Sequence, residues 1–321
     1  MAQEMYDTII IGGGPAGVAA AVYAARKRLK TLLITTKFGG QSSVSSRIEN
    51  WIGEVSITGE ELAEKLEKHV RAQKEIEIKA GEEVKDIKEL PDCGFEVKTD
   101  KEQTYRSKTL IVASGGRRKR LEVPGEEGLN GKGVAYCTTC DAPFFEGLDV
   151  AVVGSGDAAM ETVIDLTAYA DKIYLLIRGE KPKADPVNEK KATSFDKVQI
   201  IKHVEVQEIL GDKGVKGLRY RQKDTGEVKE LEVQGVFVAV GTTPNSGFVK
   251  HLVEVNRAGE VLIDFKTAET SRKGVFAAGN VTDDPFKQNN IAAGDGVRAA
   301  ISAYAYVLDF KKYSPCAGGK E

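Results

Sequence analysis

The strongest constraint on the fold is a pattern that occurs twice along the chain. Each copy consists of a short β-branched strand, a glycine turn, a helix of small residues and a second apolar strand. The first copy is YDTIIIGGGPAGVAAAVYAARKRLKTLLI, from Tyr6 to Ile34, and the second is DVAVVGSGDAAMETVIDLTAYADKIYLLI, from Asp149 to Ile177. A βαβ unit places its two strands side by side and parallel. We therefore predict an α/β protein with two doubly wound, Rossmann-like nucleotide-binding domains.

The remaining apolar segments indicate how the two domains are connected. Three of them read as strands that end in small residues or a Gly/Pro break: TLIVASGG at 109–116, GVFVAVGTTPN at 235–245 and KGVFAAGN at 273–280. The simplest arrangement builds an outer domain from both ends of the chain and inserts the second domain into the first, with two crossing strands. We predict an outer domain of residues 1–116 and 244–321 and an inserted domain of residues 117–243.

Charge and hydropathy argue against two broad classes of partner. Lysine plus arginine total 46, and aspartate plus glutamate total 48. This balance gives no reason to expect nucleic acid or a membrane surface as a partner, and no apolar run approaches the roughly 20 residues that cross a bilayer. The start, MAQEMYDTIIIGGG, has neither a basic region nor a cleavage site, so we expect a cytoplasmic location.

The first glycine turn has the spacing of a dinucleotide-binding loop. Gly12, Gly14 and Gly17 supply G-x-G-x-x-G between a strand and a helix. In such a loop the first glycine permits the turn, the second lets the backbone approach a pyrophosphate, and the third lets the helix pack on the strand. Glycines that only close a turn are the alternative. The acid expected at the end of the next strand is missing, because that strand ends in Thr35 and Thr36, so a threonine hydroxyl is one candidate for holding the ribose.

The second glycine turn keeps a related spacing, G-x-G-x-x-A, in the same strand–turn–helix context. A C-x-x-C motif lies between the two loops. Two dinucleotide sites with a cysteine pair between them indicate an electron relay from nicotinamide to flavin to disulfide. The expected nicotinamide-loop residues are Gly154, Gly156, Asp157, Ala158 and Ala159.

The cysteine pair, Cys137 and Cys140, has three readings: a redox dithiol, half of a zinc site, or two structural cysteines. Zinc requires four ligands, and no second paired motif supplies them. The other candidates stand singly in the sequence: Cys93, Cys316, His69, His203 and His251. A redox dithiol needs an accessible thiolate and a nearby group that manages protons. Asp141 is placed for that work, although a helix N-cap is its alternative role. We expect no bound metal.

Five segments resemble the low-molecular-weight thioredoxin reductases, in the order and spacing of that family. They cover nearly the whole chain: GGGPAG, GGQSSVSSRIENW, AYCTTCD, GSGDAAME, and GVFAAGN with the following Lys287 and Gln288. The second half is even more similar to the thioredoxin-reductase-like part of the flavoprotein component of alkyl hydroperoxide reductase. The segments that carry this second resemblance are PKADPV, TGEVKELEVQGVFVAVGTTPN and KGVFAAGNVTDDPFKQNNIAAGDG.

The resemblance implies an FAD-dependent disulfide oxidoreductase that forms a homodimer and reduces a thioredoxin- or glutaredoxin-like protein. The outer domain would bind FAD, and the inserted domain would bind pyridine nucleotide and carry the cysteines. Cys140 would face the flavin, and Cys137 would attack the disulfide of the partner. Asn280 replaces the usual aspartate, but its amide oxygen can still accept a hydrogen bond from the flavin. The expected FAD-binding residues are Gly12, Gly14, Pro15, Ala16, Gly17, Thr35, Gly40, Gln41, Asn50, Val84, Gly115, Gly279, Asn280, Lys287 and Gln288.

A departure from the family bears on the electron donor. Members that use NADPH carry a His-Arg-Arg-x-x-x-Arg run after the second βαβ unit, whose arginines pair with the 2′-phosphate. Here Arg178 and Lys183 are the basic residues that align with this run, Gly179 replaces an arginine, and Glu180 adds a negative charge. We therefore favour NADH over NADPH. Two alternatives stay open: the same reductase fed by ferredoxin or flavodoxin, and a flavin redox sensor without turnover.

Overall fold

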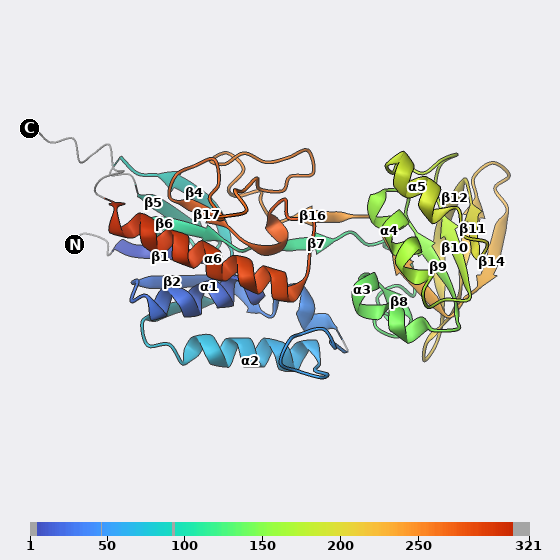
Figure 1. The fold of residues 1–321 in the computed structure, drawn as a ribbon, viewed down its shortest axis with the longest axis horizontal. Helices are drawn as coiled ribbons and strands as arrows, with labels where there is room; N and C mark the ends of the chain where they lie inside the picture. Colours follow the sequence, from blue (N-terminus) through green and yellow to red (C-terminus); the bar gives the residue numbers. More distant parts are fainter. Residues whose placement is uncertain (1–4, 46, 92–93, 311–321) are drawn as a thin grey trace, which may run out of the picture. The chain divides into compact units, whose positions relative to one another are not determined.

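The computed structural model describes residues 5–45, 47–91 and 94–310. The chain divides into two compact units (Figure 1). Unit 1 comprises Met1–Arg117 and Thr243–Glu321, and unit 2 comprises Arg118–Thr242. Each unit has its own hydrophobic core. Over the described ranges, no helix combines the length and apolar character needed to cross a membrane.

Unit 1 is built on a seven-stranded sheet in the order β3-β2-β1-β6-β5-β4, with β17 also paired to β6. The strands β3, β2, β1, β6 and β17 run parallel, whereas β5 and β4 form an antiparallel extension. The strand bounds are β1 Met5–Gly13, β2 Thr31–Phe38, β3 Ile76–Ala80, β4 Val84–Glu89, β5 Phe95–Thr99, β6 Thr104–Val112 and β17 Val275–Ala277.

The helices of unit 1 pack closely because their contact positions carry small residues. Helix α1 contains buried alanines and lies against α6 (Figure 1). At Gly296 in α6, a Cβ atom would lie 2.0 Å from the carbonyl oxygen of Ala16, so the two backbones touch where only glycine fits. The helix bounds are α1 Pro15–Arg26, η1 Gly40–Val44, α2 Gly59–Arg71, η3 Gly279–Val281 and α6 Asn289–Leu308.

Unit 2 has a parallel five-stranded sheet in the order β11-β10-β9-β15-β8 and a separate antiparallel sheet, β12-β13-β14. Its strands are β8 Val134–Ala135, β9 Asp149–Val153, β10 Lys172–Leu176, β11 Val198–Ile201, β12 Val204–Gly211, β13 Val215–Gln222, β14 Val228–Glu232 and β15 Gly235–Val238. Its helices are α3 Thr138–Asp141, η2 Ala142–Phe145, α4 Asp157–Leu166 and α5 Pro186–Ala192. The two predicted βαβ units are thus confirmed as β1-α1-β2 and β9-α4-β10.

The prediction of one strand over 235–245 is wrong. The chain forms β15 and then a separate short strand, β16 (Thr242–Pro244). Strand β15 pairs with β9 and β8, whereas β16 pairs with β7 (Gly116–Arg118), so the chain leaves one sheet for another. The break falls at Gly241, whose φ of +98° favours glycine. The strands predicted at 109–116 and 273–280 also end earlier, at Val112 and Ala277.

Candidate active site

Cys137 and Cys140 form a disulfide at the end of a strand of the parallel sheet. Their Cα atoms lie 5.3 Å apart. Cys137 follows β8 and is the N-cap residue of α3, and both cysteines are partly exposed. The N–H groups of Cys140 and Asp141 donate to the carbonyl oxygen of Cys137, at 3.2 and 3.0 Å, and close the turn. Ligands of open α/β sheets bind at the carboxyl ends of the strands, and this disulfide lies at such an end.

Asp141 is a partly buried carboxyl group next to the disulfide. Burial raises the pKa of Asp141, while the Arg118 guanidinium and a hydrogen bond from the Cys137 backbone oppose that rise. Asp141 occupies the N-cap position of η2 but makes no capping hydrogen bond through its side chain. A hydrogen bond thus holds its carboxyl group beside the Cys137 backbone.

Two threonine hydroxyls connect the disulfide helix to helix α4. The Thr138 hydroxyl donates to the Thr162 hydroxyl oxygen at 2.9 Å, and the Thr162 hydroxyl donates to the carbonyl oxygen of Ala158 at 2.7 Å. Helix α4 begins at Asp157, directly after the second glycine loop. The disulfide and the predicted nicotinamide loop are therefore held together within unit 2. No sequence motif indicates this connection, because the two threonines are 24 residues apart.

The second glycine loop adopts the conformation that its spacing predicts. Gly154 has a φ of +157°, and a Cβ atom there would lie 2.3 Å from the carbonyl oxygen of Ala239. Gly156, in contrast, faces open space. The side chain of Asp157 accepts from the Asp185 N–H at 2.8 Å. The Lys183 N–H donates to the Ser155 carbonyl oxygen at 2.6 Å, and Ala159 is fully buried.

The first glycine loop is shaped for a dinucleotide. A Cβ atom at Gly12 would lie 2.1 Å from the carbonyl oxygen of Ala113, and one at Gly17 would lie 1.8 Å from that of Gly12. At Gly14 the nearest atom would be 3.8 Å away, which leaves room for a ligand to approach the backbone. Helix α1 has no side-chain cap and no acidic residue in its first turn. Its N–H groups therefore face the loop as an anion would require, and the residues fit the FAD that the family resemblance implies.

Contacts between distant segments bring some of the other predicted FAD residues together. The Asn50 amide donates to the Gln288 side chain at 3.3 Å, and Gly40 approaches Gly14. Gly279 has a φ of +73°. The Gln41 amide donates to the Gly116 carbonyl oxygen, and the Lys287 ammonium pairs with the Glu260 carboxylate at 3.0 Å. Gly115 has a φ of +66°. Asn280 lies in η3, and Val84 is buried at the start of β4. Pro15 and Ala16 form the buried first turn of α1.

Two buried side chains lie near this loop, and only Thr35 was among the predicted FAD-binding residues. The Thr35 hydroxyl is buried and donates to the Lys37 carbonyl oxygen at 2.7 Å, so its proton is already used within the chain. Asp295 was not singled out, yet it is 2% exposed, and a hydrogen bond joins its carboxyl group to the Gly279 backbone. Burial raises the pKa of Asp295. Because Asp295 lies in a helix of small residues, its sequence context did not indicate that its carboxyl group is buried against Gly279.

A charged cluster lies just after β10, where the adenosine end of a nucleotide would bind in such a domain. Glu180 accepts from Lys202 at 2.8 Å and is paired with His203 at 2.7 Å, and these partners lower its pKa to about 2. Asp224 lies 3.4 Å from the other ring nitrogen of His203. Arg178 is exposed beside this cluster. The Glu180 carboxylate therefore stays ionised throughout the neutral pH range.

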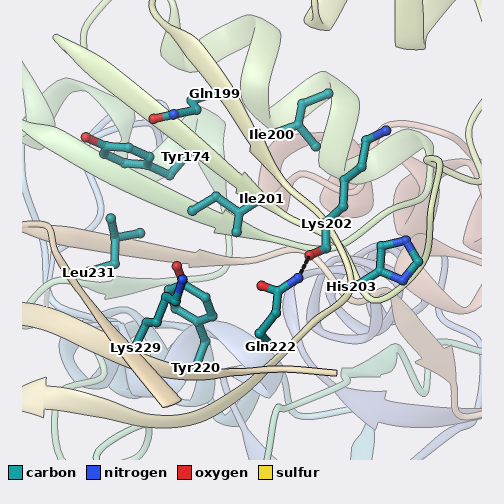
Figure 2. Close-up of a pocket in the computed structure, with 10 residues that line it drawn as sticks. All are labelled: Tyr174, Gln199, Ile200, Ile201, Lys202, His203, Tyr220, Gln222, Lys229 and Leu231. Carbon is teal, nitrogen blue, oxygen red and sulfur yellow. Dashed lines mark hydrogen bonds between the residues drawn. The ribbon is translucent and has the colours of Figure 1, made fainter. Parts of the chain in front are cut away.

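An open groove of about 570 Å³ lies between β10, β11 and the antiparallel sheet of unit 2 (Figure 2). Within it the Gln222 amide donates to the Lys202 carbonyl oxygen at 3.0 Å. None of the predicted site residues lines the groove. Its lining residues are Tyr174, Gln199, Ile200, Ile201, Lys202, His203, Tyr220, Gln222, Lys229 and Leu231. Among the residues described, no group of three or more His, Cys, Asp or Glu side chains is arranged to hold a metal ion; Cys93 and Cys316 lie outside those residues.

Comparison with known proteins gives a consistent family assignment. Residues 6–299 match the model of the family described as pyridine nucleotide-disulphide oxidoreductase. The chain is 40% identical to an NADH dehydrogenase of Bacillus subtilis over 306 residues, which is 95% of this chain and 59% of that protein. It is 38% identical to the F component of the alkyl hydroperoxide reductase of Pseudomonas aeruginosa over 310 residues, 96% of this chain and 59% of that protein. The chain thus spans less than two thirds of the length of these relatives.

Solved structures match the chain over nearly their full length. The thioredoxin reductase from Streptococcus pyogenes superposes with a TM-score of 0.89 at 37% identity, covering 95% of this chain and 99% of that one. The thioredoxin reductase from Giardia duodenalis gives a TM-score of 0.90 at 32% identity, and the match covers 95% of this chain and 100% of that one. These matches confirm the predicted fold class of two nucleotide-binding domains.

Proposed function

Because the chain belongs to the pyridine nucleotide-disulphide oxidoreductase family, we propose that it passes electrons from a reduced nicotinamide, through FAD, to the Cys137–Cys140 disulfide and then to a thioredoxin- or glutaredoxin-like protein. The main support for this proposal is the disulfide at the carboxyl end of β8. A hydrogen bond between Thr138 and Thr162 connects it to the helix that follows the second glycine loop. Unit 1 is the proposed FAD-binding domain. Bound FAD would supply the two-electron carrier between nicotinamide and disulfide.

The residues of the chain perform the thiol chemistry in this proposal. Two electrons and two protons convert the disulfide to two thiols. Cys137 then loses a proton, and its thiolate attacks one sulfur of the partner's disulfide to form a mixed disulfide. Cys140 breaks that mixed disulfide by attacking Cys137, which releases the partner as a dithiol and restores the Cys137–Cys140 bond. Asp141 is the proposed group that holds or supplies a proton at these sulfurs, because its carboxyl accepts a hydrogen bond from the Cys137 backbone.

Single cysteine variants test the assignment of the disulfide. We expect Cys137→Ser and Cys140→Ser each to abolish reduction of a thioredoxin-like protein, because a serine hydroxyl cannot form the disulfide. Bleaching of the flavin by the donor should persist in both. Cys93→Ser and Cys316→Ser are the matched controls and should turn over normally. Stopped-flow absorbance follows the flavin, and an insulin-coupled assay follows the protein disulfide. Turnover like wild type in either of the first two variants would refute the assignment.

We propose NADH as the preferred donor because Gly179 replaces an arginine at the expected 2′-phosphate position and the Glu180 carboxylate, which is paired with Lys202 at 2.8 Å, follows it. The Glu180 pKa of about 2 means that its negative charge is lost only as the pH falls toward that value. We expect Glu180→Gln to lower the preference for NADH over NADPH about two- to fivefold, the size of an exposed charge interaction. Glu227→Gln, which removes a carboxylate paired with Lys229 at 3.0 Å, is the control.

Flavin bleaching with NADH, NADPH and a reduced ferredoxin in parallel decides between donors. We expect NADH to bleach the flavin at lower concentration than NADPH. If neither nicotinamide bleaches it at about millimolar concentration, the upper end of typical KM values, while ferredoxin does, the ferredoxin-fed alternative replaces this proposal. Bleaching of the flavin without any reduction of a supplied thioredoxin-like protein would instead favour the alternative of a flavin redox sensor without turnover.

A further inference from the structure

A buried carboxylate holds the side chain of the residue that directly precedes the disulfide. That residue is Tyr136, and its hydroxyl donates to the Glu126 carboxylate at 2.7 Å. Glu126 is 2% exposed and also accepts from the N–H groups of Leu121 and Glu122, at 3.0 and 2.8 Å. A buried carboxylate needs such donors in place of water. Glu126 therefore joins the backbone of residues 121–122 to the side chain next to Cys137.

The segment that carries Glu126 is fixed to the antiparallel sheet of unit 2. The Ile209 N–H of β12 donates to the Pro124 carbonyl oxygen at 2.9 Å. Gly125 has a φ of +85°, and a Cβ atom there would lie 1.9 Å from the Ile209 carbonyl oxygen, so the two backbones touch. The Glu126 N–H donates to the Val123 carbonyl oxygen at 3.3 Å. The Glu126 carboxylate thus starts from a backbone that β12 holds in place.

The Tyr136 hydroxyl remains a hydrogen-bond donor throughout the neutral pH range. Burial raises the pKa of the Tyr136 hydroxyl, and its hydrogen bond to Glu126 raises that pKa further, so the phenol stays protonated. The side chain is half-buried and packs against the hydrophobic cluster of unit 2 that includes Ile209 and Leu218. The hydroxyl and the ring therefore tie Tyr136 to the same sheet.

The elements that carry the cysteines are too short to hold them without such contacts. Strand β8 has two residues, which pair with β15, and α3 has four. After Cys137, the Thr138 hydroxyl donates to Thr162 at 2.9 Å. Before Cys137, the Tyr136 hydroxyl donates to Glu126. Cys137 therefore lies between two side-chain hydrogen bonds to other elements of unit 2.

We propose that Glu126 and Tyr136 are positioning residues that keep Cys137 within bonding distance of Cys140 when the pair is a dithiol. The proposal rests on the redox role of the pair proposed above. In the disulfide the S–S bond fixes the two cysteines, whereas in the dithiol only the surrounding contacts do. Loss of the Tyr136 hydroxyl widens the positions open to the dithiol but not those open to the disulfide. The effective concentration of one thiol at the other then falls, so the pair becomes easier to reduce.

Equilibration with glutathione measures this effect without nicotinamide or a partner protein, so a wrong assignment of the donor or partner does not affect it. Glutathione disulfide oxidises the dithiol: the Cys137–Cys140 bond forms, the S–S bond of glutathione breaks, and the two thiol protons end on two molecules of reduced glutathione. The full-length protein with its bound flavin is incubated in mixtures of reduced and oxidised glutathione at fixed pH. Acid quenching, alkylation and mass spectrometry then give the fraction of dithiol.

We expect Tyr136→Phe to shift the equilibrium constant about threefold toward the dithiol, because it removes the hydroxyl but keeps the ring. A threefold change corresponds to about 14 mV for a two-electron couple. Tyr174→Phe is the matched control, because it removes a hydroxyl from another half-buried tyrosine packed against the same hydrophobic cluster. It should leave the constant unchanged. Thermal unfolding checks that both variants are folded.

A second variant shows whether Tyr136 acts through Glu126. Glu126→Gln replaces one of the two acceptor oxygens with a donor, so it should shift the constant in the same direction. In the double variant the two shifts should combine to less than their sum, because both changes weaken one hydrogen bond. A Tyr136→Phe constant equal to wild type, an equal shift in Tyr174→Phe, or fully additive shifts would overturn the proposal. A wild-type pair that glutathione disulfide does not oxidise would instead overturn the redox role on which the proposal rests.

Discussion

At the scale of single residues, the glycines of the first loop divide into two kinds. At Gly12 and Gly17 a side chain would collide with backbone carbonyl oxygens, so these glycines are needed by the fold itself. At Gly14 a side chain would meet nothing closer than 3.8 Å, and its φ of −78° suits any residue. The protein alone does not require glycine there, which points to a ligand that approaches the backbone.

Alanine substitutions separate these two requirements. We expect Gly17→Ala to lower the free energy of unfolding by about 1–3 kcal/mol, because the helix must shift away from the strand. Gly14→Ala should change stability by less than about 1 kcal/mol but reduce the amount of bound FAD. Thermal unfolding gives the stability, and absorbance of the flavin band gives the FAD content. Normal flavin content in a folded Gly14→Ala protein would contradict this use of the loop.

At the scale of elements, the short helix α3 is too small to hold its own orientation. It has four residues, far fewer than an isolated helix needs. Its position instead depends on β8 before it, on η2 after it, and on the Thr138–Thr162 hydrogen bond to α4. The geometry of the disulfide is thus set by neighbouring elements of unit 2.

The threonine contact predicts a measurable coupling between α3 and α4. We expect Thr138→Val, which keeps the side-chain shape but removes the donor, to lower the free energy of unfolding by about 1 kcal/mol. It should also slow electron transfer to the disulfide, because α3 loses an anchor. Thr139→Val, at an exposed position of the same helix, is the control and should change neither quantity. Chemical unfolding and stopped-flow traces measure the two effects; equal behaviour of both variants would exclude a role for this contact.

At the scale of the whole molecule, unit 1 closes around segments from both ends of the chain. Strand β17 pairs with β6, and α6 packs on α1. The two connecting strands form an antiparallel ribbon: the Asn245 N–H donates to the Gly115 carbonyl oxygen at 2.9 Å, and the Lys119 N–H donates to that of Gly241 at 3.0 Å. Because the two hydrophobic clusters of unit 1 contain no residue of unit 2, unit 1 has the core of an independent domain.

Removal of unit 2 tests this independence. Strands in a ribbon lie about 5 Å apart, so a two-residue Asn-Gly turn can join Arg117 to Thr243. We expect the shortened protein to fold, to keep its bound FAD and to lose all reactivity toward disulfides. Circular dichroism and flavin absorbance measure the outcome. A shortened protein that folds but is colourless and cannot be reconstituted with FAD would show that unit 1 is not the flavin domain.

The features of this protein that are local along the chain could be predicted from its sequence. A strand, its glycine turn and the following helix are contiguous, so spacing alone predicted both βαβ units and the close approach at Gly12, Gly17 and Gly154. The C-x-x-C pair was equally visible. The contacts between distant groups depend on the tertiary structure: Thr138 with Thr162, Asn50 with Gln288, and Asp295 with the Gly279 backbone. The change of sheet at Gly241 does too. These depend on pairing and burial among segments that the chain brings together only when it folds.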